Sequence, residues 1–163
     1  MAISVLRLLF AAILLLFAAV ASADEVHDAL PQYGLPKGLL PDSIVDYSLS
    51  NDGDFMIELA APCYIQFSYL VYYEKTIRGK LSYGAISSLS GIQAKKLFFW
   101  VSITGIQAHP ADGTIKFEAG FISESLKESE FESVRHCKAT ASIRGGARGF
   151  FPEELLPLPV SEV

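Results

Sequence analysis

Histidine, cysteine and serine are the residues in this chain that could carry acid–base, metal or nucleophilic chemistry. The histidines are His27, His109 and His136, and they do not fall in a His-Glu-x-x-His or Cys-x-x-Cys spacing. No Gly-x-Ser-x-Gly elbow is present. His136 adjoins Cys137, which cannot act as a nucleophile once it is oxidised. We therefore predict no catalytic residue, no metal and no cofactor. A triad assembled from dispersed residues stays the alternative, because triads are spatial.

Residues 1–23 have the three parts of a cleavable secretory signal. Arg7 makes the start positive, an apolar run follows from Leu8 to Val20, and Ala21-Ser22-Ala23 supplies the small residues that a signal peptidase recognises. A transmembrane anchor is the alternative, but a membrane span needs about 20 apolar residues and this run is shorter. We expect a secreted, extracellular chain that begins at Asp24 and has no transmembrane segment.

The charge and the cysteines fit such a secreted domain. The net charge is −5, and removing Arg7 with the signal makes it −6. An acidic chain offers no basic face to phosphates, so we expect no nucleic-acid partner. In an oxidising compartment the pair Cys63 and Cys137 predicts a disulfide. Closing so long a loop would stabilise the fold by roughly 4 kcal/mol.

Alternation with period two dominates the chain after its first helical segment. Strands are expected at 45–49, 55–59, 69–83, 97–106 and 115–122, with a weaker candidate at 137–143. The alternation continues to Phe121, which is expected to point inward with Ile115 and Phe117. Asn51-Asp52-Gly53 and Asp112-Gly113 indicate hairpin turns, and Gly79 indicates a bulge.

The remaining segments complete a single domain. Short helices are expected at 25–33, interrupted by Pro31 and ended by Gly34, and at 125–131. Residues 84–91, rich in Ser and Gly, are expected to form a flexible connection. We predict an antiparallel β-barrel or sandwich with one or two short helices over residues 24–144. An extended or disordered tail is expected at 145–163.

The unusual feature is the apolar segment Leu97-Phe98-Phe99-Trp100-Val101. Read as a strand, it has Leu97, Phe99, Val101 and Ile103 on one face and Phe98 and Trp100 on the other. Burial of both faces under a helix or loop is the ordinary interpretation. The alternative is that Phe98 and Trp100 line an apolar cavity for a hydrophobic ligand. Other aromatic residues could extend that lining: Tyr64, Phe67, Tyr69, Tyr72 and Tyr73. Of these we select Tyr72 as the third candidate lining residue.

Five segments together resemble the plant domain-of-unknown-function family 538. They are 34–42 (Gly-Leu-Pro-Lys-Gly-Leu-Leu-Pro-Asp), Ala61-Pro62-Cys63-Tyr64, 71–84, 89–100 and Lys116-Phe117-Glu118-Ala119-Gly120. The resemblance covers roughly Val26 to Cys137. It implies a plant protein of the apoplast or cell wall, with a mostly antiparallel β fold similar to the barrel of the bactericidal/permeability-increasing lipid-binding proteins. Chlorophyll hydrolysis is also suggested for this family, but no nucleophile and base can be mapped onto the residues of this chain.

The function that we expect is non-enzymatic binding of a lipid or another amphiphilic small molecule. It depends on the doubly apolar segment and on the barrel analogy, and a fold alone does not fix a function. One alternative is an esterase-like hydrolase, for example of a chlorophyll ester. Another is a cell-wall or defence protein whose exposed aromatic residues dock a carbohydrate or a protein.

Overall fold

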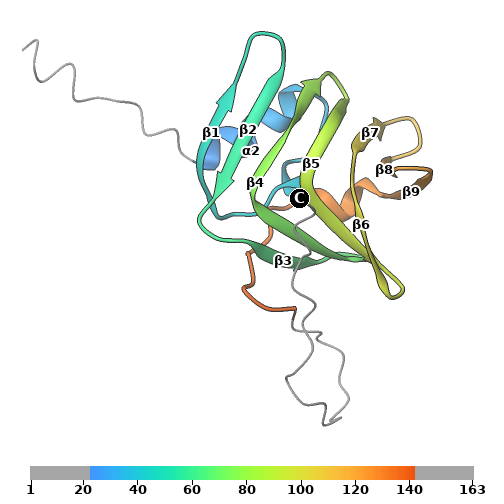
Figure 1. Cartoon of the computed structure of the whole chain (residues 1–163). Helices are drawn as coiled ribbons and strands as arrows, with labels where there is room; N and C mark the ends of the chain where they lie inside the picture. Colours follow the sequence, from blue (N-terminus) through green and yellow to red (C-terminus); the bar gives the residue numbers. More distant parts are fainter. Residues whose placement is uncertain (1–22, 142–163) are drawn as a thin grey trace, which may run out of the picture.

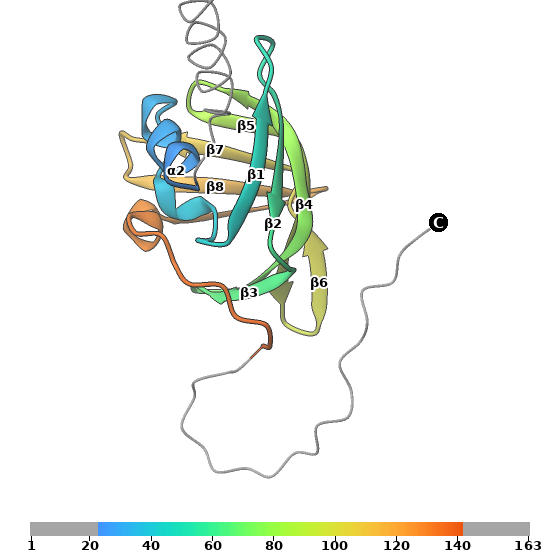
Figure 2. The ribbon, with the colours of Figure 1, turned by 90° about the vertical axis from the view of Figure 1, so that its left-hand side faces the viewer.

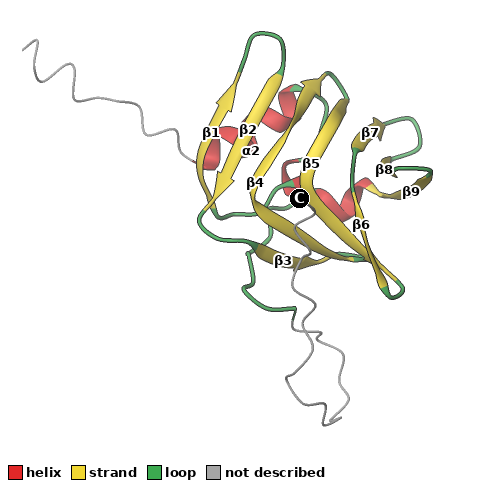
Figure 3. Ribbon diagram, viewed as in Figure 1, coloured by secondary structure: helices red, strands yellow, loops and turns green. Residues whose placement is uncertain are grey.

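A computed structural model describes residues 23–141 of the chain. In this part it has nine β-strands, one α-helix and two 3₁₀ turns. The strands are β1 (Ile44–Leu49), β2 (Asp54–Leu59), β3 (Cys63–Gln66), β4 (Leu70–Ser82), β5 (Ala85–Lys96), β6 (Phe99–Ser102), β7 (Gly105–His109), β8 (Thr114–Ala119) and β9 (Ile122–Lys127). The helical elements are α2 (Ala23–Gln32), η1 (Lys37–Leu39) and η2 (Glu128–Phe131). The fold is mainly β, as the alternation predicts (Figure 3).

All strands belong to one antiparallel sheet with the order β1-β2-β4-β5-β7-β8-β9, to which β3 is added beside β4 and β6 beside β5 (Figure 1). The sheet is strongly curved, and α2 lies in its hollow (Figure 2). Among the described residues no pairing joins β1 to β9, so the sheet stays open and is not closed into a barrel. The predicted class, an antiparallel barrel-like or sandwich-like β fold with short helices, is confirmed.

The long hairpin of β4 and β5 bends, and its two ends pair with different strands of the sheet. β4 pairs with β3 through its first residues and with β2 through its last, while β5 pairs first with β7 and then with β6. The register between β4 and β5 shifts at Gly79, where the bulge is predicted. A second bend lies at Gly91, which has φ +93° and where a Cβ would stand 2.4 Å from the carbonyl oxygen of Thr76. Only glycine fits so close an approach.

Helix α2 ends as its sequence predicts. Gly34, at φ +71°, follows the last turn, and its N–H donates to the carbonyl of Pro31 at 3.0 Å. The N–H of Leu35 donates to the carbonyl of Leu30 at 3.1 Å, which completes a Schellman cap. Pro31 does not stop the helix, because it lies in the last turn. Leu30 and Leu35 are both buried, so the cap directs the chain into the core.

Two predictions about the middle of the chain are wrong. Residues 84–91 are not a flexible connection, because β5 runs through them. Ile86 and Leu89 are buried there, and the serines pair with the exposed cations of β4. The expected strand 97–106 is divided, because Lys96 pairs with Phe99 and leaves Leu97 and Phe98 as a two-residue turn. Strand structure resumes in β6, which ends at Ser102, and begins again in β7 at Gly105.

The predictions near the C-terminus are partly wrong as well. The helix expected at 125–131 is strand β9 followed by η2, and Phe121 lies fully exposed in the β8–β9 turn instead of facing inward. The strand expected at 137–143 is reduced to one bridge between Tyr64 and Lys138 within the described residues. The predicted signal, apart from Ala23, and the predicted tail at 145–163 lie outside the described residues. Between residues 23 and 141 no helix has the length and apolar character needed to cross a bilayer.

The predicted disulfide is present and fastens the C-terminal end to the sheet. Cys63, at the start of β3, is bonded to Cys137, with a Cα–Cα distance of 5.3 Å. We call residues 132–138 the closing segment. The backbone N–H of Tyr64 donates to the carbonyl of Lys138 at 2.8 Å, and the N–H of Cys137 donates to Oδ1 of Asp42 at 2.9 Å. The closing segment therefore covers the free edge of β3.

Candidate functional site

The hollow of the sheet contains two apolar cavities that meet at Leu39, Ile92 and Ile106. We call them the first lobe, of about 70 Å³, and the second lobe, of about 60 Å³. A single water needs roughly 10–15 Å³ measured in this way, so each lobe has room for several. Their lining is almost entirely hydrocarbon and aromatic. Cavities of this character stay dry and accept apolar molecules.

The first lobe is built by the inward-facing residues of the strands that meet at the bend. Alternation points every second side chain to the concave face. These inward residues are Val71 and Tyr73 of β4, Ile92 and Ala94 of β5, Val101 of β6 with Ile103 just after it, and Phe117, Ala119, Ile122 and Leu126 of β8 and β9. Val101 and Ile103, which the sequence places on one face, both point into this lobe, whereas Leu97 and Phe99 of the same predicted face are exposed.

Tyr73 holds η1 against this lobe. Its ring is 2% exposed, and its hydroxyl donates a hydrogen bond of 3.0 Å to the carbonyl oxygen of Leu39. Burial raises the pKa of Tyr73 well above its usual value, so the phenol stays protonated and can donate. Leu39 in turn lines both lobes. The bond thus fixes the wall that the two lobes share.

The second lobe lies between α2 and the other half of the sheet. Val26 and Leu30 of α2 face it from one side, and Ile57, Ile77 and Leu81 face it from β2 and β4. The two lobes are adjacent, because Leu39, Ile92 and Ile106 line both of them.

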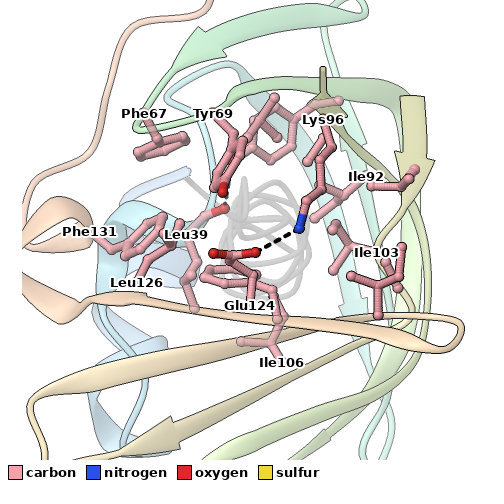
Figure 4. A pocket seen from close by; sticks show the side chains of 17 residues that line it. Leu39, Phe67, Tyr69, Ile92, Lys96, Ile103, Ile106, Glu124, Leu126 and Phe131 are labelled. Atoms are coloured by element: carbon pink, nitrogen blue, oxygen red, sulfur yellow. Dashed lines mark hydrogen bonds and ion pairs between the residues drawn. The ribbon is translucent and has the colours of Figure 1, made fainter. Parts of the chain in front are cut away.

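Three polar side chains stand at the rim of the first lobe: Lys96, Glu124 and Tyr69 (Figure 4). Nζ of Lys96 lies 2.8 Å from Oε2 of Glu124, and the two side chains are 38% and 43% exposed. The hydrogen bond from Lys96, the charge of Lys96 and a hydrogen bond from Tyr69 together lower the pKa of Glu124. Glu124 raises the pKa of Lys96 in the same way. The rim therefore presents a cation, an anion and a phenol side by side.

An aromatic stack closes the lobe between the β3–β4 turn and η2. The ring of Phe131 lies 4.8 Å from that of Phe67 and 5.3 Å from that of Phe117. The guanidinium of Arg135 lies 4.6 Å from the centroid of the Phe67 ring and donates to the carbonyl of Gln66 at 2.7 Å. The stack and the closing segment together bridge the open side of the curved sheet.

The three side chains predicted to line the cavity do not line it. Phe98 is 90% exposed in the β5–β6 turn. Tyr72 and Trp100 lie on the outer face of the sheet, where they cluster with Tyr64 at centroid distances of 5.0 to 6.2 Å. We call Tyr64, Tyr72 and Trp100 the outer aromatic cluster. Burial of both faces of this segment is therefore wrong, because the segment turns before it can form a continuous strand.

The sequence reasoning missed Lys96 and Glu124. Lys96 shares the inward parity of Ile92 and Ala94, so it could have been placed at the rim once 85–96 was recognised as a strand. Glu124 belongs to a segment that was interpreted partly as helix. Their pairing spans 28 residues of sequence, and no local pattern indicates it.

The histidines lie away from the two lobes. His27 is buried in α2 and donates from Nε2 to the carbonyl oxygen of Pro41 at 3.0 Å. His109 ends β7. Nδ1 of His136 is hydrogen-bonded to Oδ2 of Asp42, with the His136 side chain 92% exposed. Among residues 23–141 no His, Cys, Asp and Glu side chains gather into a metal-binding group.

Partial burial tends to raise the pKa of Asp42, but the N–H of Cys137 and the imidazole of His136 outweigh it, so the pKa of this carboxyl is lowered. Both of these partners belong to the closing segment. Asp42, which lies between η1 and β1, therefore anchors the closing segment through its contacts with the backbone of Cys137 and the imidazole of His136.

A comparison of the sequence with known protein families gives a match. The profile of the family described as "Protein of unknown function, DUF538" matches residues 26–132, which include every strand and the whole cavity lining. No curated protein matches the chain.

Proposed function

The chain belongs to the DUF538 family, and we propose that it is a non-enzymatic binding protein for a single-chain amphiphile. The observation that carries the proposal is the pair of adjacent apolar lobes, which share three lining residues, with a polar rim at the first of them. A hydrocarbon chain buried in the lobes leaves water at a gain of about 0.8 kcal/mol for each methylene group. Secretion, inferred from residues 1–23, would place this binding outside the cell.

The rim suggests which headgroup is preferred. An anionic head beside Lys96 would also face the carboxylate of Glu124, and a cationic head beside Glu124 would face the ammonium of Lys96. An uncharged or zwitterionic head can satisfy both groups and the Tyr69 hydroxyl without disrupting the ion pair. We therefore propose lipids such as monoacylglycerol or lysophosphatidylcholine, in preference to free fatty acids.

The test is a titration of the protein, made in a secretory host, with a fluorescent lysophosphatidylcholine. Native mass spectrometry of the same protein checks that one lipid is bound per chain. The variant Ala94→Phe places a ring in the first lobe and should abolish binding. Ala85→Phe makes the same change at the other end of β5, at a residue that lines neither lobe, and should bind as the unmodified protein does. Equal binding by both variants would show that the lobes are only imperfect packing.

The headgroup preference has its own test. In Glu124→Gln, Lys96 loses its counter-charge, so a fluorescent fatty acid should bind more tightly relative to the lysolipid. The change should be about fivefold or less, since an exposed ion pair contributes little to binding energy. An unchanged ratio would mean that the rim does not determine the headgroup preference and that only the apolar lobes contribute to lipid selection.

A further inference from the structure

Two turns of the sheet carry large apolar side chains into solvent. In the β5–β6 turn, Leu97 and Phe98 are 79% and 90% exposed, and Phe99, the first residue of β6, is 67% exposed. In the β8–β9 turn, Phe121 is fully exposed, and Ile122, the first residue of β9, is 46% exposed. We call these five residues the apolar tips.

The apolar tips flank the rim of the first lobe. Lys96 directly precedes Leu97, and Glu124 stands two residues after Ile122. The 2.8 Å contact between Lys96 and Glu124 therefore joins the bases of the two turns. Lys96, Glu124 and Ile122 also line the lobe. Any surface that meets the apolar tips is adjacent to the rim.

We propose that the apolar tips insert into a zwitterionic lipid surface and so bring the rim of the first lobe against the membrane from which its ligand is taken. This inference rests on the proposed function. Its physical basis is that exposed Phe, Leu and Ile side chains gain free energy on leaving water. The β5–β6 turn, Leu97-Phe98, also lacks the Asn or Gly that two-residue hairpin turns ordinarily carry. Leu97 even adopts φ +55°, which is costly for a branched side chain.

The charges around the apolar tips fit a zwitterionic surface better than an anionic one. Lys96 and Glu124 neutralise each other at the rim, and Lys95 adds one exposed cation at the base of the β5–β6 turn. Attraction to anionic lipid takes a cluster of about four to eight basic residues. The chain as a whole carries −5. Insertion of apolar side chains is then the source of affinity, and binding should depend little on salt.

The outer aromatic cluster lies where an interfacial belt would be needed. Trp100 follows the β5–β6 turn directly and packs with Tyr64 and Tyr72 at centroid distances of 6.0 and 6.2 Å. Tyr and Trp favour the headgroup level of a membrane, because their rings are apolar and their N–H or O–H groups remain hydrated. The apolar tips would enter the acyl region while this cluster stays at the boundary.

The experiment measures co-sedimentation of the protein with phosphatidylcholine vesicles at low and high salt. Phe98→Ser and Phe121→Ser should each weaken vesicle binding about tenfold, since each removes one fully transferred phenyl group. Tyr83→Ser is the matched control, because Tyr83 is an 81% exposed aromatic residue in the β4–β5 turn, away from the rim. It should bind vesicles as the unmodified protein does. Both Phe side chains are exposed, so the variants should unfold at the unmodified temperature.

The outcomes separate this inference from the proposed function. The Phe variants should still bind the fluorescent lysophosphatidylcholine in solution but extract it from vesicles about tenfold more slowly. Ala94→Phe should still sediment with vesicles and extract nothing. Lipid binding in solution without vesicle binding would overturn the membrane inference and leave the cavity proposal standing. So would vesicle binding that needs anionic lipid, or a dimer in sedimentation that the Phe variants dissociate, since the apolar tips would then face another partner.

Discussion

Removing the disulfide should lower the free energy of unfolding by an amount that can be calculated, and it should leave lipid binding in the cavity unchanged. The double variant Cys63→Ala, Cys137→Ala replaces a buried cysteine and its partner by small apolar side chains, so no polar group is left buried in their place. The principal loss is the restriction that the bond places on the unfolded chain. Neither sulfur atom belongs to a residue that lines a lobe.

The magnitude follows from the sequence separation of 74 residues between the two cysteines. The loop-closure relation then gives about 15 cal/mol/K, which is about 4.5 kcal/mol at 25 °C. The Tyr64–Lys138 bridge and the Asp42 contacts would persist in the folded variant, so this entropic value is the main contribution to the difference.

Urea unfolding measures the loss, with the fluorescence of Trp100, the single tryptophan, as the probe and circular dichroism as a second one. The midpoint should fall, and the dependence of the unfolding free energy on urea should steepen, because the unlinked chain exposes more surface. The reduced unmodified protein should match the double variant. A loss under about 1 kcal/mol would refute the loop-closure reasoning. Loss of lysolipid binding by a variant that is still folded would refute the conclusion that the disulfide does not contribute to the cavity.

Three further predictions concern Gly38, with Gly105 as its control, Tyr73 and Asp42. Gly38→Ala should destabilise the protein by about 1–3 kcal/mol in urea unfolding, because the new Cβ would stand 2.4 Å from the carbonyl oxygen of Phe131; Gly105→Ala meets only the movable end of a glutamate side chain and should cost less. Tyr73→Phe should cost about 1–3 kcal/mol in the same assay by leaving a buried carbonyl without its donor, and an unchanged midpoint would mean that η1 moves or water replaces the phenol. Asp42→Asn should reduce stability by about 1 kcal/mol or less near neutral pH. Because the folded pKa of Asp42 is lowered from 3.8, the unmodified protein should keep its advantage above that pH and lose it as the pH falls through the lowered folded value; a difference that does not change with pH would contradict this.

Local signals in the sequence predict much of the fold. Gly34 ends α2 because its left-handed conformation completes a cap. Gly79 marks the place where the β4–β5 register shifts. The strand expected at 69–83 is present as β4, and its alternation puts Val71, Tyr73 and Ile77 together on the concave face, since the side-chain period of a strand is fixed by its backbone.

The errors arise where tertiary packing overrides local composition. The serines at 87, 88 and 90 suggest a loop, yet two of them pair with Lys80 and Arg78 in the ladder. Leu97 carries no turn signal, and its positive φ is imposed by the pairing of Lys96 with Phe99. The residues that line the cavity are the inward-facing ones of β4 and β6, whereas the predicted lining residues Tyr72 and Trp100 lie on the outer face of the sheet.

The distance along the chain between Cys63 and Cys137 also sets an order of events during synthesis. At 5–20 residues per second, Cys63 is added to the chain about 4 to 15 s before Cys137 is. Phe131, which completes the aromatic stack, is made only six residues before Cys137. Through that interval the inward faces of β4 and β5 have no cover from η2. A nascent chain of this protein should therefore be a client for chaperones that hold apolar surface until translation is nearly complete.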